Sequence, residues 1–402
     1  MQTMAWPMEP DEVMQVLRAI QFEHYKWDIF HRGDTSILPE ALILSPQEHQ
    51  SLISTAEQIW EVILSLEPIL CSDPDLLHHL AIPASLHPAI LHQRPEHPRV
   101  TRCDFHLTEQ DQWVISEFNN DVPSGFAESV GLAAVLTRDW ADRFPNLSFQ
   151  GDLRQALLQS LRPFPTIGLV HATGYSEDLQ HVALVGEWLE ADGHATILAS
   201  PANLQVRDGR AYLFETPVDA IFRYYPGEWI GDLPNARDWE EAAAFLPMMN
   251  PLSALTTQSK RFYASWQEDP LPLSPPQREL LDTFIPTSRY LSSIDAEELL
   301  SHPKKWVLKG SFGRMGDTVR IAHLMPPGEW EIAVEDALKV PDHIAAQQRF
   351  DISPLWTSRG LGYATIGVYL VDGRFAGYFS RIDKGPLIDY DSWYVPTLVR
   401  TS

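Results

Sequence analysis

The chain has 402 residues, which is enough for two or three packed units. Hydrophobic residues make up 44% of the sequence and charged residues 21%, a balance that excludes an intrinsically disordered chain. The formal net charge of -24 disfavours binding to nucleic acid and to anionic membrane surfaces, and two cysteines are too few for a disulfide framework.

The amino-terminal region does not resemble a targeting signal. Residues 1–11 lack a basic segment followed by an apolar core, and no apolar run approaches the ~18 residues of a membrane span. We therefore expect a cytoplasmic protein. Residues 1–95 are predicted to be mostly helical, because apolar residues recur at three- and four-residue spacing in 10–23 and 45–66. Ser45 before Pro46 is typical of a helix start.

Strands and helices alternate in the middle of the chain. Residues 99–107 and 112–119 are predicted strands, joined by a hairpin turn at 108–111, and 125–140 has a helical pattern. Short apolar strands at 166–170, 195–198 and 219–223, with a helix at 177–191, predict a small parallel sheet. We expect a Rossmann-like unit of ~70 residues here.

The last part of the chain has an antiparallel pattern. The proline-rich stretch 270–276 is a predicted surface connection. Beyond it, predicted strands cover 306–309, 317–322, 363–371 and 374–381. Asp372-Gly373 is a strong hairpin turn signal.

Polar side chains in the first predicted hairpin could hold a metal. Strand alternation places Arg102 and Asp104 on one face of one strand, and Glu117 and Asn119 on one face of its partner. If these faces coincide, two carboxylates and an amide oxygen meet beside a guanidinium, and Mg²⁺ prefers such ligands. The alternative is a solvent-facing hairpin with cross-strand ion pairs. Cys103 should point to the opposite face, which disfavours it as a nucleophile.

A glycine-bearing loop forms the second candidate feature. Residues 309–316 contain three glycines, Lys309 and Arg314, but not the Gly-Lys-Ser/Thr ending of a P-loop. Because strands are predicted on both sides, the loop would fold over a nucleotide, with backbone N–H groups and Lys309 contacting phosphates. The alternative is a simple hairpin turn. Further candidates for a nucleotide pocket are Lys260, Arg381, Gln347 and Gln348, although taken singly such residues are usually solvated surface.

Several segments, taken in order, resemble the synthetase module of the glutathionylspermidine synthase family, an ATP-grasp group. Arg102-Cys103-Asp104 is similar to the family's Arg-x-Asp, and residues 117–124 are similar to its Glu-Tyr-Asn-x-Asp-Thr-Pro-Thr/Ser. Residues 221–229, 309–316, 380–383 and 393–396 resemble later family motifs. Together these matches span most of the chain after residue ~95.

The resemblance implies an ATP- and Mg²⁺-dependent ligase that forms an acyl phosphate, which an amine then attacks. It implies a magnesium site at Asp104, Glu117 and Asn119, and a contact of Arg102 with the transferred phosphoryl group. It places Lys260, Lys309, Gly313, Arg314, Gly316, Gln347, Gln348 and Arg381 at ATP, and Asp121 and Ser124 at the carboxylate substrate. Met315, Val122 and Gly227 depart from the family motifs and leave the identity of both substrates open.

We therefore predict an α+β ATP-grasp fold with an inserted Rossmann-like domain. The predicted parts are a helical region at 1–95, a first core segment with the magnesium site at 96–160, the Rossmann-like insertion at 161–235, and an antiparallel ATP-binding domain at 236–402. Expected partners are a small-molecule or peptide carboxylate and an amine, and the sequence leaves a homodimer open. The alternative function is a non-catalytic, nucleotide-binding partner or scaffold subunit, which the replacement at Met315 would favour.

Overall fold

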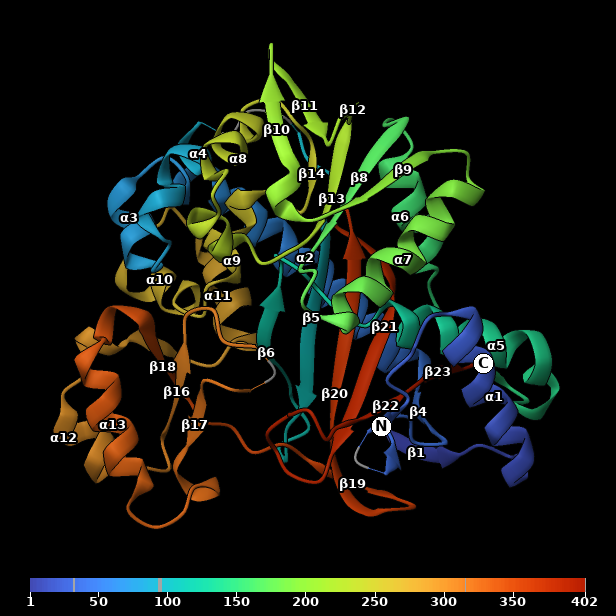
Figure 1. Ribbon diagram of the computed structural model, residues 1–402. Coiled ribbons are helices and arrows are strands. Elements are labelled where there is room, and N and C mark those ends of the chain that lie inside the picture. Colours follow the sequence, from blue (N-terminus) through green and yellow to red (C-terminus); the bar gives the residue numbers. More distant parts are fainter. Residues whose placement is uncertain (32, 93–95, 315, 402) are drawn as a thin grey trace.

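The chain has a mixed α+β fold in which several sheets surround a central one (Figure 1). The computed structural model describes residues 1–31, 33–92, 96–314 and 316–401. Met315 therefore lies outside the described residues. None of the described helices is both long enough and apolar enough to cross a bilayer.

The central sheet joins the middle of the sequence to its end. Its order is β22-β21-β20-β5-β6, with β19 also paired to β20, and every pairing is antiparallel. Both predicted hairpins are confirmed, and Asp372 and Gly373 have the two positive φ angles, 47° and 78°, of a type I′ turn. The strands are β5 (Val100–Leu107), β6 (Trp113–Asn119), β19 (Pro354–Thr357), β20 (Gly360–Val371), β21 (Arg374–Asp383) and β22 (Trp393–Val395).

The two faces of the central sheet differ in character. Helix α2 (Pro46–Leu70) covers one face, where Ile59 and Leu66 join Phe105 and Ile366 in the main hydrophobic core. Ser45 caps this helix, as predicted, by accepting a hydrogen bond from the Glu48 N–H. The charged residues of β5 and β6 point to the other face, away from α2.

The predicted parallel sheet is confirmed. Its order is β14-β13-β8-β9, and all three pairings are parallel. The sheet continues past residue 235, because its edge strand β14 begins at Met248. A small antiparallel sheet, β10-β11-β12, was missed in the sequence. These elements are β8 (Thr166–His171), β9 (Ala195–Ala199), β10 (Leu204–Arg207), β11 (Arg210–Leu213), β12 (Thr216–Pro217), β13 (Ala220–Tyr224), β14 (Met248–Met249), α6 (Leu153–Leu161), α7 (Ser176–Ala191) and α8 (Ala236–Ala243).

A third sheet, here called the flanking sheet, has its own small core. Its order is β15-β18-β16-β17, and Trp306, Leu308 and Trp330 pack between it and two helices. In Figure 1 it stands beside the central sheet, in orange. Its elements are β15 (Ser288–Tyr290), β16 (Trp306–Gly310), β17 (Val319–Ile321), β18 (Ile344–Gln348), α12 (Ala296–Ser301) and α13 (Glu329–Lys339).

The region at 1–95, predicted to be mostly helical, also contains strands that the sequence did not predict. β4 (Glu40–Leu44) is buried throughout and pairs with β1 (Gln2–Ala5) and, in parallel, with β23 (Thr397–Arg400). Because β23 lies at the other end of the chain, no local pattern could reveal this pairing. The other elements here are β2 (Phe30–His31), β3 (Asp34–Thr35), β7 (Leu147–Ser148), α1 (Pro10–Glu23), α3 (Pro74–His79) and α4 (His87–Leu91).

One prediction is confirmed with a local difference and another needs correction. The predicted helix at 125–140 is present, and its first turns form a π-helix (Ala127–Gly131) that continues into α5 (Leu132–Trp140). The predicted connection at 270–276 ends early, since Ser274 caps α11 (Pro275–Phe284) with Pro275 in its first turn. The remaining helices here are α9 (Leu255–Gln258) and α10 (Phe262–Glu268).

Candidate functional site

A cavity of about 520 Å³ lies where the central sheet, the flanking sheet and the parallel sheet meet. Thirteen of the fourteen residues expected at the site line it, and Asp121 is the one that does not. The lining thus includes residues from both the first hairpin and the glycine-bearing loop, which are about 200 residues apart in the sequence. The thirteen are Arg102, Asp104, Glu117, Asn119, Ser124, Lys260, Lys309, Gly313, Arg314, Gly316, Gln347, Gln348 and Arg381.

The first hairpin brings its polar residues onto one face. In the register of β5 and β6, Asp104 stands opposite Glu117 and Arg102 opposite Asn119. A β-bulge follows Asp104, so Ser116 is the extra residue between Glu117 and Ile115. Cys103 is fully buried on the opposite face, in the main hydrophobic core, and burial raises the pKa of its thiol. The predicted coincidence of the two faces is therefore confirmed.

Asp104 lies between two arginines. Arg102 donates to its two carboxylate oxygens at 2.7 and 3.0 Å, and Arg381 donates to Oδ2 at 2.9 Å. Both guanidinium groups also lie over the ring of Phe379. Burial disfavours the charge of Arg102, but Asp104 outweighs this effect and raises the pKa of Arg102. Arg102 also donates to the Ser124 carbonyl oxygen at 2.5 Å, which places the segment after β6 beside the arginines.

Two lysines surround Glu117. The Lys260 Nζ lies 2.7 Å from Glu117 Oε2, and the Lys309 Nζ donates to the Ser116 carbonyl oxygen at 3.1 Å. Burial disfavours ionisation of Glu117, but Lys260 and then Lys309 outweigh it and hold the pKa of Glu117 well below its usual range. Burial lowers the pKa of Lys309 to about 8, although Glu117 partly opposes this shift and Lys260 adds to it.

The ligand set at the hairpin fits magnesium. The Asn119 Nδ2 lies 3.4 Å from Asp104 Oδ2 and 3.3 Å from Glu117 Oε1, so the three side chains share one corner of the cavity. Among the described residues, no group of three or more His, Cys, Asp or Glu could hold a metal ion. The Asn119 amide nitrogen faces the two carboxylates, so the side chain would have to turn its Oδ1 toward them to complete the hard oxygen set that Mg²⁺ uses with phosphate oxygens and water.

The glycine-bearing loop joins β16 to β17, as predicted, and two of its glycines are required by close packing. A Cβ on Gly313 would lie 1.6 Å from Thr318 Oγ1. Gly316 has a φ of +72°, and a Cβ there would lie 2.7 Å from the backbone oxygen of Ile388. The loop therefore packs closely against the segment that follows β21.

Arg314 links the glycine-bearing loop to the end of the parallel sheet. It forms an ion pair with Glu228 and lies 5.1 Å from the centroid of the Trp229 ring, at the end of the parallel sheet. Burial, with Asp121 adding to it, raises the pKa of Glu228, although Arg314 opposes this shift. The loop is thus fixed by contacts with two other parts of the molecule.

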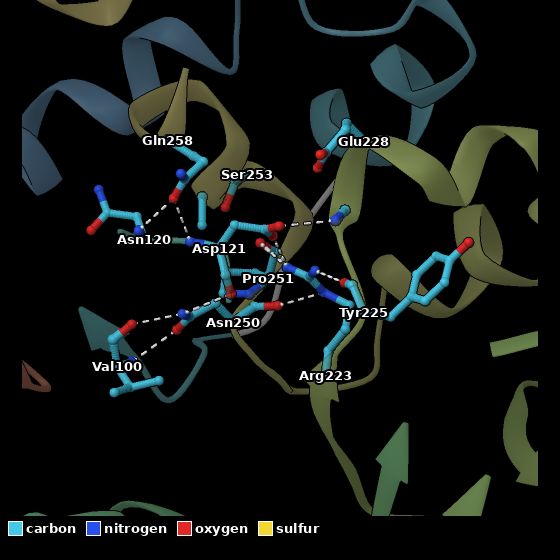
Figure 2. A network of polar contacts seen from close by, with 12 residues as sticks. Val100, Asn120, Asp121, Arg223, Tyr225, Glu228, Asn250, Pro251, Ser253 and Gln258 are labelled. Carbon is cyan, nitrogen blue, oxygen red and sulfur yellow. Dashed lines mark hydrogen bonds and ion pairs between the residues drawn. The ribbon is translucent and has the colours of Figure 1, made fainter. Parts of the chain in front are cut away.

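Asp121 belongs to a buried network behind the cavity wall (Figure 2). Its carboxylate accepts a hydrogen bond from Arg223 at 2.5 Å and another from the Gly227 N–H at 3.0 Å. Arg223 also donates to the carbonyl oxygens of Asn250 at 3.0 Å and Tyr225 at 2.5 Å, and its side chain is fully buried. These contacts fasten the end of β6 to the ends of β13 and β14. They position Asn119 and Ser124 but leave Asp121 away from the cavity.

The acidic end of the cavity was not predicted from the sequence. Glu177 and Asp178, in the first turn of α7, line it together with Tyr175 and Trp229. Burial and the neighbouring Glu177 raise the pKa of Asp178 to about 7, although Arg314 opposes the shift. The start of this helix was predicted, but nothing in the local sequence indicated that it lines this cavity.

Comparisons with known proteins bear on the family and the fold. Residues 13–400 match the model of the family described as glutathionylspermidine synthase preATP-grasp. A search of curated proteins finds no match. The fold is similar to that of a glutathione synthetase-like effector (GSS30) from Globodera pallida, in its apo form, with a TM-score of 0.62 and 11% identity. That match covers 98% of this chain and 99% of the other. A protein from Methylobacillus flagellatus KT, assigned as a gamma-glutamylcysteine synthetase, matches with a TM-score of 0.46, 13% identity, and coverage of 80% and 82%.

Proposed function

Because this chain belongs to the glutathionylspermidine synthase preATP-grasp family, we propose that it is an ATP- and magnesium-dependent carboxylate–amine ligase. It would convert a peptide or amino-acid carboxylate into an acyl phosphate, which an amine attacks to form an amide. In this proposal the central and flanking sheets form the ATP-grasp core, and the parallel sheet is the Rossmann-like insertion.

The observation that carries the proposal is the meeting of two distant segments in one cavity. The hairpin contributes Asp104, Glu117 and Asn119, and the flanking sheet contributes Lys309 and its glycine-bearing loop. An acidic corner next to a basic, glycine-bearing loop is the combination that a metal–triphosphate complex requires. The volume of about 520 Å³ is in the range of small-molecule sites.

Each group has a role that follows from its chemistry. Asp104, Glu117 and Asn119 would hold magnesium, which offsets the negative charge of phosphates when it is bound. Lys260 and Lys309 would bind phosphate oxygens. Arg102 and Arg381 would stabilise the charge that develops as the phosphoryl group moves to the carboxylate, because guanidinium groups match the geometry of both groups. Gln347 and Gln348, at the end of β18, would contact the base.

The acidic end of the cavity suits the amine. Tyr175 is an exposed aromatic residue in the lining, Trp229 already holds the Arg314 guanidinium over its ring, and Glu177 offers an exposed carboxylate. An aliphatic amine is an ammonium ion at neutral pH, so this end attracts it electrostatically. The two ends would thus hold the two substrates on either side of Arg102.

The test is a matrix of carboxylates and amines incubated with Mg-ATP. Glutathione, short peptides and amino acids serve as carboxylates, and spermidine, other polyamines and ammonia serve as amines. We expect release of ADP and phosphate that depends on one carboxylate, and amide formation when the matching amine is present. Hydroxylamine, a nucleophile that is largely unprotonated at neutral pH, should trap the acyl phosphate as a hydroxamate. ATP binding without turnover in any combination would refute the ligase and favour a nucleotide-binding partner subunit.

A further inference from the structure

Asp178 is a half-buried carboxylate at the end of the cavity that α7 forms. It lies in the first turn of α7 and lines the cavity with Tyr224 and Trp229. Its neighbour Glu177 is exposed. Two adjacent carboxylates therefore stand in different environments, one in water and one against the cavity wall.

Contacts of His181 fasten the first turn of α7 to the segment that carries Ser124. The Gly125 N–H donates to His181 Nε2 at 2.8 Å, and His181 Nδ1 lies 2.8 Å from the backbone oxygen of Glu177. An N–H can only donate, so Nε2 accepts and Nδ1–H donates to Glu177, and the imidazole is neutral. Arg102 donates to the Ser124 carbonyl oxygen on the same segment. Asp178 is thereby held at a fixed place relative to the arginines that would bind the reacting carboxylate.

Charged and titratable groups from several elements surround Asp178. Burial has the largest effect and raises its pKa, Glu177 adds to this, and Arg314 and a hydrogen bond with the Ala172 backbone oppose it, so that the pKa is about 7. Arg314 itself is paired with Glu228, which limits how strongly it can hold the Asp178 charge. The groups that share this end of the cavity are Tyr175, Glu177, Tyr224, Glu228, Arg314, Asp317 and Tyr390.

We propose that Asp178 is the general base of the amide-forming step, a role that rests on the proposed ligase function. The attacking amine arrives as an ammonium ion and must lose a proton before its lone pair can react. Asp178 takes that proton. The C–N bond then forms, the C–O bond to the phosphoryl group breaks, the second nitrogen proton goes to the departing phosphate, which leaves as inorganic phosphate, and the first proton passes from Asp178 to water.

A carboxylate that titrates near neutrality is suited to this role. It is ionised in about half of the molecules at pH 7, yet it is basic enough to accept a proton. The sign of the pH dependence follows directly: kcat rises with pH and then levels off, because only the ionised form of Asp178 is active, and the rise lies below the free-protein pKa of about 7 because a bound ammonium ion favours the charged carboxylate.

The experiment compares the wild-type protein with Asp178→Asn, using glutathione and spermidine or the pair that the matrix identifies. General-base catalysis contributes about 10²–10⁴-fold, so we expect kcat for amide formation to fall by about 100-fold or more. Hydroxamate formation with hydroxylamine should stay within about twofold, because that nucleophile has no proton to lose before it attacks. The remaining rate with spermidine should keep climbing with pH, as free amine becomes more abundant.

Two variants serve as controls. Glu177→Gln removes the neighbouring carboxylate that would attract the amine, so it should raise the KM for the amine while the pH profile of kcat still levels off. Asp208→Asn changes an exposed turn residue between β10 and β11, outside the cavity lining, and should leave kcat and KM unchanged.

The outcomes separate the two proposals. If the wild-type protein forms neither hydroxamate nor ADP, the ligase function fails. If the wild type forms hydroxamate and Asp178→Asn ligates spermidine within about threefold of it, with the same pH profile, the general-base role is refuted. Loss of hydroxamate formation together with amide formation would also refute it, because Asp178 would then act before the acyl phosphate exists.

Discussion

Replacing Asp121 separates a structural role from a substrate contact. In Asp121→Ala, Arg223 would keep its charge with a fully buried side chain and lose the one carboxylate that pairs with it. The Gly227 N–H would lose its acceptor as well. Breaking a buried ion pair from one side costs about 3–5 kcal/mol, because the remaining charge is left without compensation. We therefore expect the free energy of unfolding to fall by about that amount, a large share of the total stability of about 5–15 kcal/mol.

The assay is equilibrium urea denaturation followed by tryptophan fluorescence. Asp121→Asn keeps the shape of the side chain and an acceptor for Gly227, so its loss should be smaller than that of the alanine variant. Glu215→Ala breaks the exposed Arg207–Glu215 pair at 2.8 Å and should cause no measurable loss, because water screens that pair. The reasoning is refuted if Asp121→Ala unfolds at the wild-type urea concentration and only the KM for the carboxylate rises, since Asp121 would then contact substrate.

Three other changes test the nucleotide end. Glu117→Gln removes one proposed magnesium ligand and the partner of Lys260, so ADP release should fall by about 100-fold or more while thermal unfolding shows a folded protein. Burial lowers the pKa of Lys309 to about 8, and bound phosphate should raise it again, so ATP binding takes up a proton. Calorimetry should therefore show that the affinity for ATP weakens by up to about tenfold per pH unit above 8. Lys309→Arg stays charged and should abolish that slope. Gly316→Ala forces a Cβ to within 2.7 Å of the Ile388 oxygen at a φ of +72°, so the KM for ATP should rise about fivefold or more. In the control Gly174→Ala the new Cβ meets no atom within 4 Å, and the KM for ATP should not change.

The proposed metal corner could be predicted only in part, although a hairpin is a local structure. Side chains alternate along a strand with a period of two, and the short turn at 108–111 fixes which residues stand opposite each other. Alternation puts Arg102 with Asp104 and Glu117 with Asn119, but the pairing next to the turn, Phe105 with Ile115, would set Asp104 opposite Ser116 and turn Glu117 to the other face. The bulge at Ser116 lies between the turn and the Asp104–Glu117 pair, and it shifts the register by one residue so that both pairs share a face.

The rest of the site depends on contacts between distant segments. Asp121 follows the hairpin in a polar stretch that is typical of an exposed turn, and its partner Arg223 is 102 residues away. A charged residue within the apolar strand 220–224 was the only local sign that β13 holds a buried ion pair. Glu177 and Asp178 were unremarkable acidic residues at a helix start until the fold placed that helix over the cavity. The parallel pairing of β4 with β23 joins the two ends of the chain in the same way.

The charge balance around the hairpin argues for a polyanionic ligand in a protein whose net charge is -24. Here Arg102 and Arg381 pair with Asp104, Lys260 pairs with Glu117, and Lys309 lies beside them. Burial, opposed by Glu117 and reinforced by Lys260, lowers the pKa of Lys309 to about 8. Lys309 therefore loses its positive charge as the pH rises above about 8. A divalent cation that took over the two carboxylates would leave all four cations in need of anionic partners, and phosphate oxygens supply such partners. Without ligand, the internal ion pairs therefore keep the carboxylates and the cations charged and close together. When the proposed Mg-ATP complex binds, magnesium would replace the cations at the carboxylates and phosphate would replace the carboxylates at the cations.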